Sequence, residues 1–165
     1  METKTASTRT EGLLALFDMH TTYFARAIDG ISEEDAYNRL NTKANHIAWL
    51  AGSLVAQRYE MVQETHPGMK QYGHELFKDN KGIQDGVKYP TLAQYLEDWQ
   101  KISPVAREVL VNSGDEKLDS IIDMGFMKMS YYELITFTIY REANMIGQLA
   151  LWRRLLDYPA LRYDD

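Results

Sequence analysis

Four long segments of this chain share one pattern, and that pattern constrains the fold more than any other feature. Apolar residues recur three and four positions apart over about residues 11–29, 43–64, 91–112 and 130–156. Because such positions share one face of an α-helix, each segment predicts an amphipathic helix with one buried face. Helices of about 20 residues are ~30 Å long. Together they predict an all-α fold, a four-helix bundle with long crossover connections.

Local signals predict where these helices begin. In a capping box, a Ser or Thr side chain and a Glu or Gln side chain three residues later bond to free backbone N–H groups at the helix start. The pairs with this spacing are Thr8 with Glu11, Thr91 with Gln94, and Ser130 with Glu133. The second helix has no such pair, and its apolar pattern begins near Lys43.

The segments between the helices differ in character. Residues 66–90 are rich in Gly, Lys and Asp with little periodicity, which predicts a crossover or lid that is longer than the usual connection in a bundle. Ser32 precedes three acidic residues, which predicts a short helix through Leu40. Residues 118–129 predict an irregular connection without β-structure. Pro104 predicts a kink in the third helix.

Composition limits the classes of function. A chain of 165 residues suits a single domain, residues 1–165, with one core. Its net charge of -6 opposes binding to phosphate backbones, so we expect no nucleic-acid partner. The longest apolar runs, such as residues 47–55, are shorter than the ~20 residues of a membrane-spanning helix, so we expect no membrane partner. Residues 1–11 lack the apolar stretch of a signal peptide, which predicts a cytoplasmic location.

Two stretches carry more information than amphipathic spacing. Residues 45–52 read Asn-His-Ile-Ala-Trp-Leu-Ala-Gly, and residues 141–149 read Arg-Glu-Ala-Asn-Met-Ile-Gly-Gln-Leu. Together with Leu-Trp-Arg-Arg-Leu-Leu at 151–156, the later stretch resembles the last helix of the bacterial DinB/YfiT-like superfamily, and the earlier one resembles that family's second helix. The resemblance covers about residues 8–158. It implies a DinB-like four-helix bundle of the metalloenzyme type, often a homodimer.

The resemblance also implies a set of metal ligands. One histidine on the second helix and two on the last, four residues apart, hold zinc or nickel and leave one position open for a small thiol or for hydrolase-like chemistry. This chain keeps His46, but Arg141 and Met145 align with the paired histidines. A guanidinium has no lone pair and a thioether is a weak zinc ligand, so we expect no three-histidine metal site and no cofactor. With no cysteine in the chain, any metal would need His, carboxylate or thioether ligands.

The candidate ligand-binding residues are therefore His46, Arg141, Glu142 and Met145, which we expect to meet in one interior hollow. Should a divalent metal such as zinc or nickel bind, its candidate ligands are His46, Glu142 and His20. Each residue also has a structural interpretation. His46 suits a hydrogen-bonded core histidine, Arg141 and Glu142 suit ion pairs, and Met145 suits core packing.

These residues are compatible with three functions, and they do not identify a catalytic residue for any of them. The first is a DinB-like protein whose pocket binds a small anionic or thiol-containing ligand, with a guanidinium replacing part of the metal's charge. The second is a metal-dependent thiol S-transferase or hydrolase-like enzyme with a non-standard metal site. The third is a non-catalytic homodimeric bundle. The eleven Tyr and three Trp of the chain also favour association into a dimer.

Overall fold

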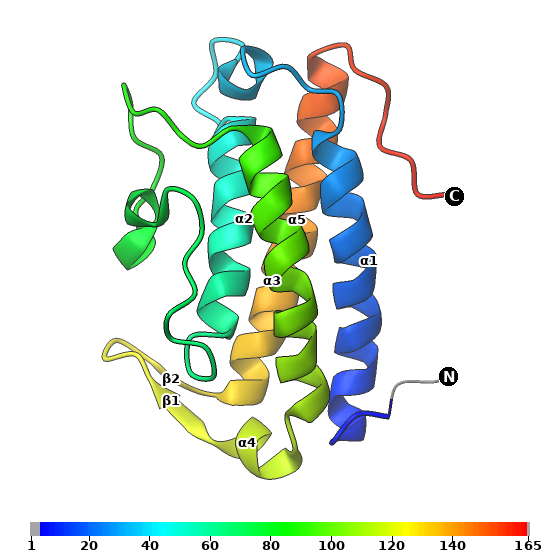
Figure 1. The fold of residues 1–165 in the computed structure, drawn as a ribbon, viewed down its shortest axis with the longest axis vertical. Helices are drawn as coiled ribbons and strands as arrows, with labels where there is room; N and C mark the ends of the chain where they lie inside the picture. The colour runs from blue at the N-terminus through cyan, green and yellow to red at the C-terminus, as the bar shows by residue number, and fades with distance from the viewer. Residues whose placement is uncertain (1–3, 165) are drawn as a thin grey trace.

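Four long helices form the body of the protein in a computed structural model that describes residues 4–164 (Figure 1). They are α1, Glu11–Ile28; α2, Ile47–Met61; α3, Leu92–Asn112; and α5, Tyr131–Leu155. The helices lie side by side, with α1 and α5 running in one direction and α2 and α3 in the other. Helix α1 packs against α5 and α3, and α2 packs against α3 and α5. The all-α prediction is confirmed. Of the predicted domain 1–165, residues 1–3 and 165 lie outside the described range.

Shorter elements occupy the connections. They are the 3-10 helices η1, Thr8–Thr10; η2, Asp35–Tyr37; η3, His74–Leu76; and η4, Lys78–Asn80; the short helix α4, Asp115–Asp119; and the strands β1, Ile121–Asp123, and β2, Lys128–Ser130. The two strands pair antiparallel, with Ile121 opposite Ser130. The expectation of no β-structure is therefore wrong at this hairpin. Its turn contains Gly125 at φ 82°, a left-handed conformation that glycine adopts without a Cβ clash.

Two of the three predicted capping boxes are confirmed. The side chains of Thr91 and Gln94 cap α3 reciprocally, and those of Ser130 and Glu133 do the same for α5. The prediction for the first helix is wrong. Ser7 caps a 3-10 turn that precedes α1, and Thr10, the residue before α1, makes no side-chain cap.

Helix α2 begins later than the apolar pattern predicts. His46 is its N-cap residue, with extended backbone angles, and its Nδ1 accepts a hydrogen bond of 3.1 Å from the Trp49 N–H. A capping side chain satisfies one of the backbone donors left free at a helix start. This start is not predicted from the sequence, because histidine is not among the residues usually expected at an N-cap.

The region after α1 is also less helical than expected. Only the single turn Asp35–Tyr37 forms, and Leu40 and Asn41 follow with positive φ angles of 45° and 58°. Such residues cannot continue a right-handed helix. Helix α3 contains Pro104 within its bounds, and the predicted kink there stays a prediction.

The connection between α2 and α3 returns along the outside of α2 to the other end of the molecule (Figure 1). It contains η3 and η4 as its only regular elements, in agreement with the predicted crossover at 66–90. The crossover packs closely on α2 at Gly52. A Cβ atom there would lie 2.2 Å from the Phe77 ring and 2.4 Å from the Tyr95 hydroxyl, so the missing side chain permits this packing.

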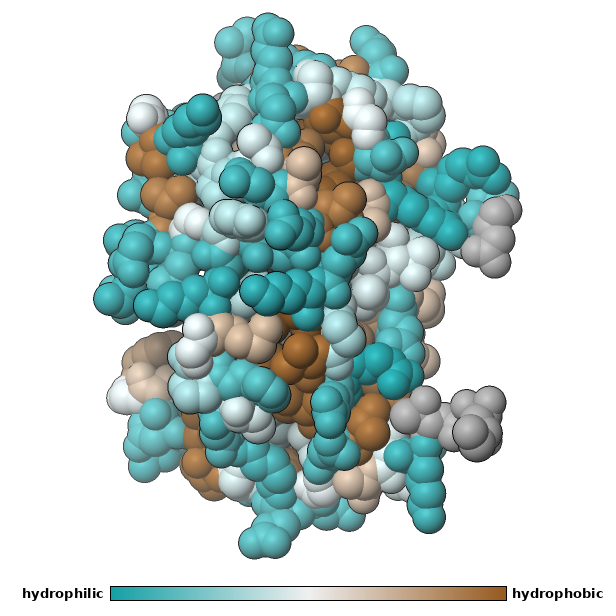
Figure 2. All heavy atoms as spheres, viewed as in Figure 1, coloured by the Kyte–Doolittle hydropathy of each residue, from teal (hydrophilic) through white to brown (hydrophobic). Residues whose placement is uncertain are grey.

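The core lies between the four long helices, where Phe17, Phe24, Leu54, Trp99 and Leu110 are almost fully buried. Figure 2 shows a mainly hydrophilic outer face with smaller apolar areas between the polar ones. Within residues 4–164, every helix is too short or too polar to cross a lipid bilayer.

Candidate functional site

A buried ion pair joins α2 to α5 in the middle of the molecule. Glu142 and Arg58 are both 0% exposed. The Glu142 carboxylate accepts hydrogen bonds from Arg58 Nε at 2.7 Å and Nη2 at 2.9 Å, and its Oε2 also lies 3.1 Å from His20 Nδ1. Arg58 Nη1 donates to Thr21 Oγ1 and Ser103 Oγ, each at 2.7 Å. The network thus connects all four long helices.

The surroundings of Arg58 explain how its charge is tolerated. Its guanidinium carbon lies 3.7 Å from the centre of the Phe17 ring and 3.6 Å from that of Trp99. Burial alone would raise the pKa of the Glu142 carboxyl, but the charge and hydrogen bonds of Arg58, with a further hydrogen bond from His20, hold it below its ordinary value. Glu142 is therefore ionised and fully engaged, as its structural interpretation predicts.

His46 lies at the start of α2 in an aromatic setting. Its ring centre is 5.0 Å from that of Tyr37 and 5.4 Å from that of Tyr89. Burial is the main cause that lowers the pKa of this imidazole. Its Nδ1 already accepts from the backbone of Trp49. The contacts of His46 are those of a capping residue.

Arg141 lies on α5 and reaches α2 about two and three turns beyond His46. Its Nη1 donates to Gln57 Oε1 at 2.5 Å, and its Nη2 donates to Ser53 Oγ at 2.8 Å. Burial lowers the pKa of the half-buried Arg141, and the charges of Glu60 and Glu142 oppose that shift. The α2 side chains that face Arg141 are thus Ser53 and Gln57, and His46 has other neighbours.

The expected residues therefore have separate neighbours in the structure. His46 contacts aromatic rings, Arg141 contacts α2, Glu142 pairs with Arg58, and Met145 is 4% exposed within the apolar core. Of the alternative metal ligands, His20 and Glu142 are in contact. However, no three His, Asp or Glu side chains within the described residues are grouped as metal ligands. With Glu142 already bound by Arg58, these residues do not fit the metal that the resemblance implies.

Arg141 lines a cavity of about 190 Å³ between α2, α5 and the crossover. We call it the Arg141 pocket, and its lining residues are Trp49, Ser53, Ala56, Gln57, Glu60, Phe77, Asn80, Lys81, Gly82 and Arg141. Two of them are cations and one is a carboxylate. The indole Nε1–H of Trp49 is buried and has no acceptor among the described residues. The pocket therefore has an excess of positive charge.

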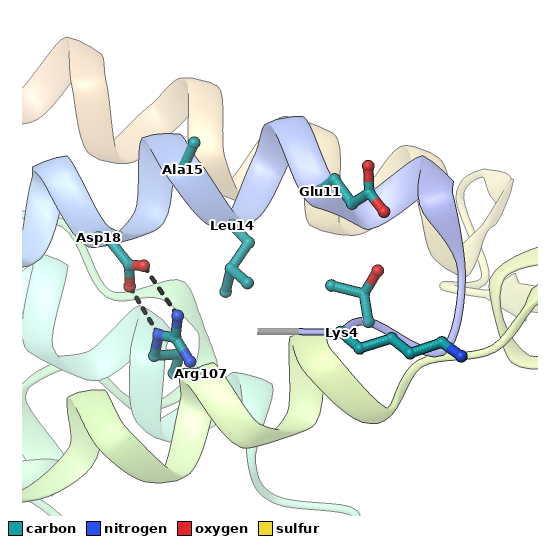
Figure 3. A pocket seen from close by; sticks show the side chains of 7 residues that line it. Lys4, Glu11, Leu14, Ala15, Asp18 and Arg107 are labelled. Atoms are coloured by element: carbon teal, nitrogen blue, oxygen red, sulfur yellow. Dashed lines mark hydrogen bonds and ion pairs between the residues drawn. The ribbon is translucent and has the colours of Figure 1, made fainter. Parts of the chain in front are cut away.

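A larger cavity, of about 550 Å³, lies between the N-terminal segment, α1 and α3 (Figure 3). Asp18 and Arg107 line one end of it, with Arg107 Nε and Nη2 donating to the two carboxylate oxygens at 2.8 Å and 3.0 Å. Because this guanidinium is already held by a carboxylate, the cavity is a weaker candidate for anion binding than the Arg141 pocket.

Ser53, Gln57 and Arg58 were not among the residues predicted for the site. A signal for them was present, because these are polar residues in the otherwise apolar stretch 47–59 of α2. Polar side chains on a helix that is buried nearly all round must find hydrogen-bond partners inside the protein.

Comparison of the chain with known protein families found no family model that matches it, and none of the curated proteins matches it either.

Proposed function

We propose that this chain is a divergent DinB/YfiT-like four-helix bundle that binds a small anionic or thiol-containing ligand in the Arg141 pocket, without a three-histidine metal. The observation that carries the proposal is the state of Arg141. Its two hydrogen-bond partners, Gln57 and Ser53, are both neutral. The cation is half-buried beside a cavity while lacking a carboxylate partner in direct contact within residues 4–164.

A partly buried cation without a carboxylate in direct contact favours an anion from solution. Removing charge from water costs free energy, and a bound carboxylate or thiolate offsets that cost through charge-assisted hydrogen bonds. A guanidinium has five N–H groups, of which the bonds to Gln57 and Ser53 use two. The remaining donors and the nearby Lys81 suit a carboxylate held by two hydrogen bonds.

The size of the pocket restricts the ligand. A volume of about 190 Å³ corresponds to roughly six water molecules at ~30 Å³ each. This space suits a small acid, or the charged end of a larger molecule.

The arrangement of the helices supports the family part of the proposal. Four long helices with a crossover between the second and third agree with what the resemblance implies. Arg141 and Met145 stand at the positions aligned with the paired histidines, and Ser53 and Gln57 are the α2 residues that contact Arg141. A cage built around position 141 would therefore take its α2 ligand from position 53 or 57, where a serine hydroxyl and an amide oxygen now accept hydrogen bonds from Arg141.

Calorimetry on the wild type and Arg141→Gln tests the proposal. The probes are acetate, succinate, inorganic phosphate and mercaptoacetate. We expect at least one probe to bind the wild type, and Arg141→Gln to weaken it roughly tenfold or more, because hydrogen bonds to charged groups contribute ~1.5–3 kcal/mol.

Arg154→Gln is the matched control, since Arg154 is an exposed residue on the same helix outside the Arg141 pocket. Equal affinity in the wild type and Arg141→Gln would contradict the proposal. Stoichiometric zinc or nickel in protein purified without an affinity tag would contradict its metal-free part.

A further inference from the structure

Glu60 gives the Arg141 pocket a negative side. Glu60 is an exposed residue that lines the pocket, and its carboxylate makes no hydrogen bond or ion pair within the part of the chain that the structure describes. Arg141 and Glu60 therefore place a cation and a carboxylate at one cavity without direct contact between them. Desolvation by the surrounding protein raises the pKa of Glu60, while the charge of Arg141 lowers it.

A second cavity, of about 140 Å³, adjoins the pocket and shares Ala56, Glu60 and Phe77 with it. Gln71 lines this second cavity and is only 6% exposed. Its Nε2 donates to the Gly52 carbonyl, but its Oε1 accepts no hydrogen bond from the described residues. His74 and the exposed Lys78 border the same cavity.

Charged groups of opposite sign thus meet at the two cavities. Arg141 and Lys81 line the first, Lys78 lines the second, and Glu60 lines both. A simple anion would pair with the cations but would be repelled by Glu60. A molecule with a carboxylate at one end and an ammonium at the other would match both.

We infer that the Arg141 pocket binds a small aminocarboxylate, with the carboxylate toward Arg141 and the ammonium toward Glu60. This inference rests on the proposed function and specifies its ligand. An ammonium has three N–H donors, and the Glu60 carboxylate offers two acceptor oxygens on one side of the pocket. Arg141, Lys81 and Lys78 outnumber Glu60 in charge, so an acidic amino acid with a second carboxylate suits the cavities better than a neutral one.

Calorimetry with L-aspartate and succinate tests the inference, because the two probes share a carbon skeleton and differ by one amino group. We expect the wild type to bind L-aspartate roughly tenfold more tightly than succinate. Glu60→Gln should remove most of that preference by weakening L-aspartate while leaving succinate unchanged or slightly tighter. Glu116→Gln, which removes an exposed carboxylate far from both cavities in sequence, should preserve it. Circular dichroism confirms that each variant is folded.

The outcomes separate this inference from the proposed function. If succinate binds as tightly as L-aspartate and Arg141→Gln weakens both, the anion pocket stands and the aminocarboxylate inference is overturned. If the preference survives Glu60→Gln, the assignment of the ammonium to Glu60 is wrong. If neither probe binds the wild type at millimolar concentration, and L-alanine and propionate also fail to bind, the inference is overturned. The proposal that the Arg141 pocket binds carboxylates is then overturned with it.

Discussion

Two arginines on the inner sides of the helices carry different roles. Arg58 is fully buried and bound by a carboxylate, whereas Arg141 is half-buried and bound by neutral groups. Removal of one member of a buried ion pair leaves the other charged and unpaired, which costs far more than loss of a surface pair. We therefore assign Arg58 to stability and Arg141 to ligand binding.

Glu142→Gln should lower the free energy of unfolding by about 3–5 kcal/mol, because it leaves the Arg58 guanidinium buried without a counter-charge. Denaturant titration of wild type and variant measures the difference. A double variant, Arg58→Met with Glu142→Leu, should lose less, since it buries neither charge. If Glu142→Gln changes the unfolding midpoint no more than Glu116→Gln does, the assignment of this ion pair to stability is wrong.

The same pair predicts a dependence of stability on pH. The folded-state pKa of Glu142 lies below the ordinary value of 4.5, so the unfolded chain takes up a proton first as the pH falls. Its contribution is complete above pH ~4.5 and is lost as the pH falls toward the folded-state pKa. The difference in unfolding free energy between wild type and Glu142→Gln should therefore shrink from pH 7 to pH 3. A difference that stays constant would mean that the folded-state pKa is not lowered.

Capping and close packing decide how the elements begin and meet. The side-chain caps at Thr91, Ser130 and His46 define three helix starts. The crossover is held against α2 by the close approach of Phe77 to Gly52. This contact also places Phe77, Lys81 and Gly82 along the Arg141 pocket, so packing of the crossover shapes the candidate site.

Gly52→Ala should destabilise the protein by ~1–3 kcal/mol, because its Cβ would overlap the Phe77 ring and the Tyr95 hydroxyl. It should also weaken binding in the Arg141 pocket by displacing the crossover. Gly147→Ala is the matched control on α5, where a Cβ meets nothing within 4 Å. That change should stabilise the helix by up to ~1 kcal/mol. Thermal unfolding of the two variants compares them, and equal melting temperatures would exclude the close packing.

On the scale of the whole molecule, the homodimer remains a prediction. Phe137, Tyr140, Leu151 and Leu155 are each more than half exposed on α5. Their spacings of three, eleven and four residues place them on one face of the helix. Such a face suits association with a second copy. Light scattering at micromolar concentration should give about twice the 19.1 kDa of one chain, and Leu151→Glu should halve it. A wild-type mass of one chain would contradict the prediction.

The sequence by itself determined the four long helices and two of their caps. Helical periodicity and capping boxes depend on residues three or four apart, so Thr91 with Gln94 and Ser130 with Glu133 act locally, whatever the rest of the chain does. Glu142 also emerged as a candidate, but its partner did not.

Only the tertiary structure decided which polar side chains meet. The pairing of Arg58 with Glu142 spans 84 residues of sequence, as does the bond between Gln57 and Arg141. Such contacts depend on how far each helix is shifted and rotated when its apolar face packs against its neighbours. One helical residue advances by ~1.5 Å and turns by ~100°. A sequence pattern that places a helix to within a few residues therefore cannot distinguish His46 from Ser53 as the α2 residue that faces Arg141.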